Sequence, residues 1–210
     1  LSYSKAVISE IESRRQEIID SSNFNTLYIG GGTPSVFPLL YLEDIVKALG
    51  QNDYDEFTIE VNPEDIIEKG PSYVQSLQVL GVNRISMGVQ SFDDCMLKWM
   101  NRRHDSKRAK DAFRIIRESG IENLSIDLIF GLSGMTEESW RKTIYDAIHI
   151  GDDCGGKPQH ISAYQLSIES GSALEKMIES GRYVEASEEE CSRQYSILCE
   201  MLSEYGYNHY

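Results

Sequence analysis

The sequence has no closely paired cysteines, no long hydrophobic run and no excess of basic residues. No Cys-x-x-Cys spacing occurs among its four cysteines, which argues against a zinc knuckle or a disulfide framework and predicts reduced thiols. No apolar run approaches the roughly 18 residues of a membrane-spanning helix. No basic-then-apolar leader opens the chain. These absences predict a cytoplasmic protein without a membrane span.

The charge balance also limits the expected partners. The chain of 210 residues carries 34 acidic and 20 basic side chains, a formal net charge of −14. Such a surface repels phosphate backbones and anionic membranes, so nucleic acid is not an expected partner. A hydrophobic content of 40% in a chain of this length suffices for a full core. We therefore expect a single domain over residues 1–210.

One segment stands out, the run Leu-Tyr-Ile-Gly-Gly-Gly-Thr-Pro-Ser at 27–35, in which an apolar strand leads directly into three glycines. Glycine opens the backbone to a ligand, and Pro34 fixes the exit of the turn. A phosphate loop would need a lysine here, and a dinucleotide fingerprint would need glycine in place of Ser35. A tight turn after a strand explains the glycines equally well. The loop is a candidate contact surface.

Apolar runs and helical stripes alternate along the chain. The strands expected from them are 27–29, 57–61, 84–89, 123–130 and 160–166, with the start of another at 207–210. Helices are expected at 3–20, 40–49, 73–80, 94–100 with a capping box at Ser91, 109–119, 136–148, 172–179 and 187–205. This order is typical of parallel βαβ units. Since an eight-stranded barrel needs more units, we expect an α/β partial barrel, with a doubly wound sheet as the alternative.

Polar residues lie at or near the carboxyl end of each expected strand. In parallel α/β folds ligands bind at the carboxyl ends of the strands, so these residues are the candidate site. They are Gly30 to Thr33, then Glu60 with Asn62, then Gln90, then Asp127, and finally Gln165 or Ser167.

Two of these residues, Glu60 and Asp127, place a carboxylate in an otherwise apolar strand. An unpaired interior carboxylate costs several kcal/mol, so each needs a partner. That partner is either a structural ion pair or backbone amide, or a cationic or hydroxylated ligand. Arg102 is suited to grip a carboxylate bidentately, or else it is solvated. No Ser-His-Asp set, glycosidase carboxylate pair or metal site is evident.

Five segments together resemble a known family. In order they read Gly-Gly-Gly-Thr-Pro-Ser, Ile-Glu-Val-Asn-Pro, Asn-Arg-Ile-Ser-Met-Gly-Val-Gln-Ser-Phe, Ile-Asp-Leu-Ile-Phe-Gly-Leu and His-Ile-Ser-Ala-Tyr. They resemble the radical S-adenosylmethionine (SAM) family of oxygen-independent coproporphyrinogen III oxidase over residues 5–210. The segment 167–174, Ser-Ile-Glu-Ser-Gly-Ser-Ala-Leu, is similar to the haem chaperone branch of that family.

The resemblance implies a partial (βα)6 TIM-like barrel of the radical SAM type. SAM would bind across its strand ends beside a [4Fe-4S] cluster. The residues that match the family's SAM contacts are Gly31, Gly32, Thr33, Glu60, Gln90, Arg102, Asp127 and Ser167. The carboxylate of SAM suits Arg102, while its ammonium group and ribose hydroxyls suit Glu60, Gln90 or Asp127.

One departure from the family is large, because its Cys-x-x-x-Cys-x-x-Cys cluster motif does not occur in the sequence. We therefore expect an incomplete radical SAM core, truncated at both ends, whose first strand and cluster loop are missing. Such a chain is expected neither to hold the cluster nor to cleave SAM reductively.

The resemblance favours a haem chaperone that binds haem and delivers it to an acceptor protein. An alternative is a coproporphyrinogen III oxidase, which forms protoporphyrinogen IX by oxidative decarboxylation. A third interpretation, from the residues alone, is a cluster-independent barrel lyase with Glu60 or Asp127 as general base.

Overall fold

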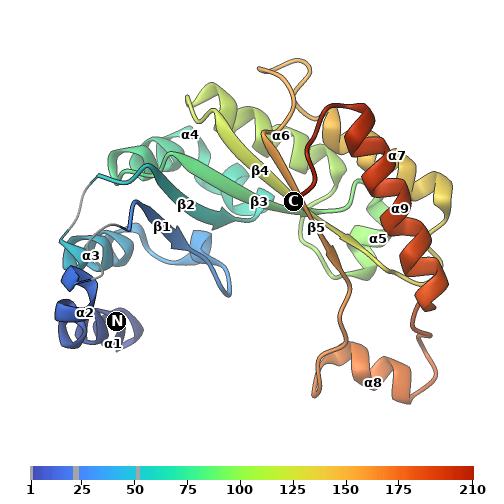
Figure 1. Cartoon of the computed structure of the whole chain (residues 1–210), viewed down its shortest axis with the longest axis horizontal. Coiled ribbons are helices and arrows are strands. Elements are labelled where there is room, and N and C mark those ends of the chain that lie inside the picture. The colour runs from blue at the N-terminus through green and yellow to red at the C-terminus, as the bar shows by residue number, and fades with distance from the viewer. Residues whose placement is uncertain (1, 21–23, 51–52) are drawn as a thin grey trace. The chain divides into compact units, whose positions relative to one another are not determined.

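The structure is a computed structural model that describes residues 2–20, 24–50 and 53–210. Its strands are β1 (Thr26–Ile29), β2 (Glu56–Val61), β3 (Arg84–Gln90), β4 (Asn123–Phe130) and β5 (His160–Gln165), ordered β1-β2-β3-β4-β5 in one sheet (Figure 1). The pairs β1·β2, β2·β3 and β4·β5 are parallel. Sequential parallel strands have no point at which the order reverses. The partial-barrel prediction is therefore confirmed, and the doubly wound alternative is wrong.

Helices connect the strands. They are α1 (Ser2–Ser13), α2 (Arg15–Asp20), the 3-10 helix η1 (Pro34–Val36), α3 (Leu39–Leu49), α4 (Pro63–Val79), α5 (Asp94–Trp99), α6 (Ser106–Glu118), α7 (Glu137–Ile148), α8 (Ala173–Glu179) and α9 (Glu188–Glu204). The helix expected over 3–20 is divided at Arg14 into two helices, α1 and α2. Among the described residues, no helix is both long and apolar enough to cross a membrane.

The chain forms two compact units. The first contains Leu1–Gly88 and Asp111–Leu124. Its core includes Phe57, Ile59, Leu77 and Ile85, none of which is exposed. Consecutive residues of β2, Phe57 to Ile59, are buried, as expected for a parallel strand that is covered on both faces. In this unit α1 packs against α3.

The second unit contains Val89–Lys110 and Ser125–Tyr210. Its largest fully buried side chain is Trp140 of α7. The indole Nε1 of Trp140 donates a hydrogen bond to the carbonyl oxygen of Gln194 in α9 at 2.8 Å. The side-chain oxygen Oε1 of Gln194 in turn accepts a hydrogen bond from the backbone N–H of Gly131, just after β4, at 2.7 Å. These two bonds fix α7 and α9 side by side next to the end of β4.

The helix α4 is longer than its sequence suggests. It begins at Pro63, ten residues before the predicted start at Tyr73, and Gly70 interrupts it with φ 67° and ψ −171°. Pro63 favours the first helical position because its φ is preset, and Glu64 and Asp65 suit the positive end of the helix dipole. The Gly70–Pro71 pair is typical of a helix end, so the sequence pattern predicts only the part of α4 that follows it.

The predicted capping box at Ser91 is wrong. The N-cap of α5 is Asp93, whose side chain accepts hydrogen bonds from the amides of Cys95 at 2.8 Å and Met96 at 3.2 Å. The Ser91 hydroxyl instead accepts from the amide of Asp93 at 3.0 Å. Ser91 therefore shapes the turn before the helix, and the carboxylate that follows it caps the helix.

The strand predicted over Tyr207–Tyr210 is also wrong, because these residues form no backbone ladder. The amide of Tyr207 closes the end of α9 on the carbonyl of Leu202 at 2.9 Å. The Tyr207 hydroxyl donates to the carbonyl oxygen of Pro158 at 2.7 Å, and that of Tyr210 lies 3.2 Å from Nδ1 of His160. Side-chain contacts hold this segment.

Candidate functional site

The glycine loop, residues 30–33, leaves β1 at its carboxyl end. Gly31 has φ +97°, a left-handed conformation that costs little only for glycine. A Cβ atom added at Gly31 or Gly32 would meet no atom within 4 Å. Packing therefore does not require these two glycines, and their backbone borders open space. This is the arrangement expected where a ligand approaches the main chain.

Glu60 of β2 lies directly beside this loop. Ile29, the last residue of β1, pairs in register with Ile59, so Glu60 sits one residue beyond the end of β1. Its Oε2 accepts a hydrogen bond from the amide of Gly31 at 3.1 Å, and its Oε1 accepts from the hydroxyl of Tyr28 at 2.7 Å. Each carboxylate oxygen can accept a second hydrogen bond, so capacity for a ligand remains. The structure thus joins two predicted site residues, Gly31 and Glu60.

The loop exit is fastened to the start of α4. Ser35 is fully buried, and its hydroxyl donates to Oδ2 of Asp65 at 2.5 Å while it accepts from the amide of Asn62 at 3.2 Å. The ammonium group of Lys69 donates to the carbonyl oxygen of Ser35. Thr33, another predicted site residue, donates from its hydroxyl to the carbonyl oxygen of Gly32 at 2.7 Å. Asp65 and Lys69 were not among the predicted site residues.

Tyr73 lies next to this network, and Lys69 Nζ is 4.4 Å from its ring centroid. Burial, and then the negative charge of Asp65, raise the pKa of Tyr73 to about 12. A raised pKa means that folding favours the neutral phenol. This contribution to stability is complete below pH 10 and is lost as the pH rises through 12.

We expect Tyr73→Phe to remove this pH dependence. Between pH 10 and pH 12 the free energy of unfolding of the wild type should fall by about 1.4 kcal/mol per pH unit more than that of the variant. Urea unfolding of both proteins across this range measures the difference, and comparison of the two cancels the titration of lysines. Parallel curves would show that Tyr73 ionises as freely in the folded state as in the unfolded state.

Gln90, in the second unit, ends β3 in a strained turn. Its φ is +68°, which is rare for a residue other than glycine, and only 9% of it is exposed. The amide of Ser91 donates to the carbonyl oxygen of Val89 at 2.8 Å, a bond that closes a three-residue turn around Gln90. Nε2 of buried His104 donates to the same oxygen at 3.0 Å. The surrounding structure therefore holds a predicted site residue in an unfavourable backbone conformation.

The strain makes a prediction about stability. Glycine adopts a φ of +68° without a steric cost, whereas alanine retains the cost, so Gln90→Gly should be more stable than Gln90→Ala by about 1 kcal/mol. The midpoints of urea unfolding of the two variants measure this difference. Greater stability of the alanine variant would contradict the turn seen here.

The remaining predicted residues also lie in the second unit. Asp127 is half-buried in β4 and pairs in register with Ser162 of β5. Arg102 is half-buried just after α5, and exposed Ser167 donates from its hydroxyl to Oε1 of Glu169 at 2.9 Å. For Gln90, Arg102, Asp127 and Ser167, a contact with a ligand stays a prediction of the sequence.

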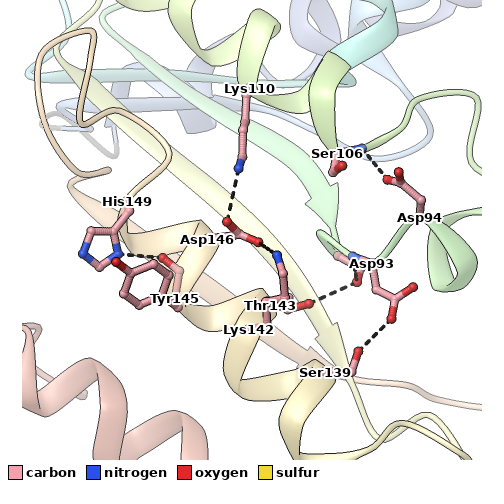
Figure 2. Close-up of polar contacts among 11 residues, drawn as sticks. Asp93, Asp94, Ser106, Lys110, Ser139, Lys142, Thr143, Tyr145, Asp146 and His149 are labelled. Carbon is pink, nitrogen blue, oxygen red and sulfur yellow. Dashed lines mark hydrogen bonds and ion pairs between the residues drawn. The ribbon is translucent and has the colours of Figure 1, made fainter.

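Asp93 and its neighbours support the segment that follows Gln90 (Figure 2). Ser139 of α7 donates from its hydroxyl to Oδ2 of Asp93 at 2.7 Å, and Asp94 accepts from the amide of Ser106 at 2.8 Å. The hydrogen bond from Ser139 lowers the pKa of Asp93, and those from the Met96 and Cys95 amides lower it further. Asp93 is the N-cap of α5 and also accepts from Ser139, so its three hydrogen bonds link two helices and we interpret it as structural.

A second carboxylate in Figure 2, that of Asp146, bridges two lysines. It accepts from Lys110 at 3.1 Å and from Lys142 at 2.5 Å. Burial acts to raise the pKa of Asp146, but the two lysines outweigh it and the pKa is lowered. Since both cations are largely exposed, we interpret this cluster as a surface ion pair that joins α6 to α7.

The described residues do not fit an iron–sulfur cluster. Within residues 2–20, 24–50 and 53–210, no three His, Cys, Asp or Glu side chains are placed to hold a metal ion. Iron–sulfur clusters need several cysteine thiolates, and Cys191 is buried in α9 while Cys95 is exposed in α5. The glycine loop and Glu60, in contrast, offer open backbone and a carboxylate, which suit a cationic or hydroxylated organic group.

The chain is similar to known proteins over nearly its whole length. Residues 5–147 match the family model described as the Radical SAM superfamily. A protein of Lactococcus lactis named Heme chaperone HemW is 31% identical over 99% of this chain and 52% of its own length. A zebrafish (Danio rerio) protein, Radical S-adenosyl methionine domain-containing protein 1, mitochondrial, is 32% identical over 90% of this chain and 41% of its own. The chain spans about half the length of the curated relatives it matches.

Solved structures agree with the sequence relatives. The coproporphyrinogen III oxidase HemN of Escherichia coli, described as a radical SAM enzyme, superimposes with a TM-score of 0.68 at 26% identity over 88% of this chain and 41% of its own. The matched family segment includes the glycine loop and β1 to β4. The chain belongs to the radical SAM superfamily, in the branch that contains the HemW haem chaperones and HemN.

Proposed function

We propose that the protein binds SAM through the glycine loop and Glu60 and acts in haem metabolism, as a haem chaperone that binds haem and delivers it to acceptor proteins. One observation carries the SAM part of this proposal: the hydrogen bond from the Gly31 amide to the Glu60 carboxylate beside backbone that borders open space. The proposed role in haem binding and delivery is supported by the relatives named Heme chaperone HemW.

The chemistry of SAM suits this part of the first unit. Its sulfonium and ammonium groups are cationic, and its ribose offers two hydroxyl donors. The Glu60 carboxylate supplies negative charge and two oxygens that each accept one further hydrogen bond. The glycine loop supplies backbone that a ligand can approach without meeting a side chain.

In the radical SAM superfamily a reduced [4Fe-4S] cluster supplies the electron that cleaves SAM. The described residues do not fit such a cluster, so no step of a reaction is assigned to them. Their proposed role is to bind and orient SAM.

The test of this function uses the natural full-length protein, prepared without oxygen and supplied with iron and sulfide. Titration with SAM by calorimetry and with haem by absorbance should each give saturable, stoichiometric binding. Added coproporphyrinogen III should remain unchanged in the presence of SAM and a reductant. Failure to bind haem would overturn the chaperone assignment, and failure to bind SAM would overturn the assignment of the glycine loop.

The second candidate is a coproporphyrinogen III oxidase. The similarity to E. coli HemN favours it, because at 26% identity the resemblance extends beyond the fold. Formation of protoporphyrinogen IX from coproporphyrinogen III in the same experiment, without haem binding, would support this function in place of the first.

A further inference from the structure

Tyr28 forms a contact that its position in β1 does not predict. The residue is 55% exposed, yet its hydroxyl donates a hydrogen bond to Oε1 of Glu60 at 2.7 Å. Tyr28 pairs in register with Thr58, so Glu60 is its diagonal neighbour on β2. Diagonal neighbours on a sheet lie within reach of a long aromatic side chain. An exposed tyrosine is thus committed to the carboxylate of the proposed SAM site.

Gly30 makes room for this contact. A Cβ atom at Gly30 would lie 2.5 Å from Cε1 of Tyr28 and 2.7 Å from Oε1 of Glu60, both closer than atoms can approach. The tyrosine ring and the carboxylate therefore meet directly above the backbone of the first glycine in the loop. Gly31 and Gly32 differ, because a Cβ at either would meet open space. Gly30 is needed for the Tyr28–Glu60 pair, whereas its two neighbours border the space for a ligand.

We infer that Tyr28 is a positioning residue for SAM binding. This inference rests on the proposed function. The Tyr28 hydroxyl holds one oxygen of Glu60 while the Gly31 amide holds the other. A glutamate side chain has several rotamers, and two donors on its two oxygens select one of them. The remaining acceptor positions of Glu60 are thereby oriented before the ligand arrives, which lowers the entropy cost of binding.

The experiment compares SAM affinities of the full-length, cluster-containing protein by calorimetry. Tyr28→Phe removes one of the two donors that hold the Glu60 carboxylate, and the cost of ordering a side chain on binding predicts an affinity lower by about 3- to 10-fold. Tyr3→Phe is the matched control, because Tyr3 is 68% exposed on α1 in the same unit and its edge contact with Phe37 involves only the ring. Its affinity should equal that of the wild type.

A double-mutant cycle separates positioning from direct contact. If Tyr28 acts through Glu60, the effect of Tyr28→Phe should disappear in the Glu60→Ala background, where no acceptor remains for its hydroxyl. An equal effect of Tyr28→Phe in both backgrounds would mean that Tyr28 contacts SAM itself, and the inference would be overturned. Unchanged affinity of Tyr28→Phe beside a SAM-binding wild type would also overturn it. A wild type that does not bind SAM would instead remove the proposed function.

Gly30→Ala gives a second, independent test. The atoms that the new methyl group would meet are the far ends of two flexible side chains, so they can move apart without unfolding the strand. The thermal midpoint should stay close to that of the wild type while SAM affinity falls at least as far as in Tyr28→Phe. Wild-type affinity in Gly30→Ala would contradict the positioning role.

Discussion

Glu60→Gln is expected to weaken SAM binding by about 10- to 100-fold, because it removes a charge-assisted acceptor worth about 1.5 to 3 kcal/mol. The substitution also replaces one acceptor oxygen of the side chain with an NH2 donor. That donor would face either the Gly31 amide or the Tyr28 hydroxyl, each of which donates to Glu60 in the native protein. Calorimetric titration of the full-length protein with SAM measures the change.

The matched control for this variant is Glu68→Gln. Glu68 is an exposed residue of α4 in the same unit, so its substitution makes the same change in net charge and leaves Glu60 and its contacts in place. The control should bind SAM like the wild type. Equal affinities of the Glu60 and Glu68 variants would show that the Glu60 carboxylate serves only to fasten the loop.

Gly31→Val is expected to abolish measurable SAM binding. The φ of +97° at Gly31 is strained for any residue with a side chain, at a cost of about 1 to 2 kcal/mol, and more for a β-branched residue. The added side chain would also fill the open space beside the loop. Strain and obstruction act together, so the loss of affinity should exceed that of Glu60→Gln in the same titration.

Gly156→Val separates the effect of backbone strain from that of obstruction beside the glycine loop. Gly156 has φ +89°, and a Cβ there also meets no atom within 4 Å, but it lies in the connection between α7 and β5. This variant should lose a similar amount of thermal stability and retain SAM affinity. If both variants lost affinity equally, general destabilisation would explain the result and the glycine loop would have no special role.

The fold was largely predictable because its signals are local. Each strand is a short apolar run followed by a helical stripe, and this repetition determines parallel strands in sequential order. The errors also have local causes. Gly70–Pro71 resembles a helix end, so the first half of α4 was missed, and Asp93 rather than Ser91 caps α5. The residues Tyr207–Tyr210 have strand propensity, but side-chain contacts hold them instead.

Most of the predicted site residues lie at or near the carboxyl ends of strands. Gly31 and Glu60 were both predicted, since the ends of β1 and β2 adjoin in a parallel pair. The partners that hold them were missed. Tyr28 is a diagonal neighbour of Glu60, and Ser35 reaches Asp65 from the far end of the loop. Such pairs depend on strand register and on the start of α4, which residue patterns do not specify.

The strained turn at Gln90 was likewise invisible in sequence, since nothing in the residue type signals a positive φ. The role of His104, which donates to the carbonyl oxygen of Val89, does not follow from the sequence either. A buried histidine is recognised as a hydrogen-bond partner only once its acceptor is known.

A crystal structure of the full-length protein with SAM bound tests the central claim most directly. The account predicts that the Glu60 carboxylate lies within hydrogen-bonding distance of the ligand, with the main chain of Gly31 and Gly32 against it. SAM bound elsewhere, with the Tyr28–Glu60–Gly31 contacts facing solvent, would contradict it.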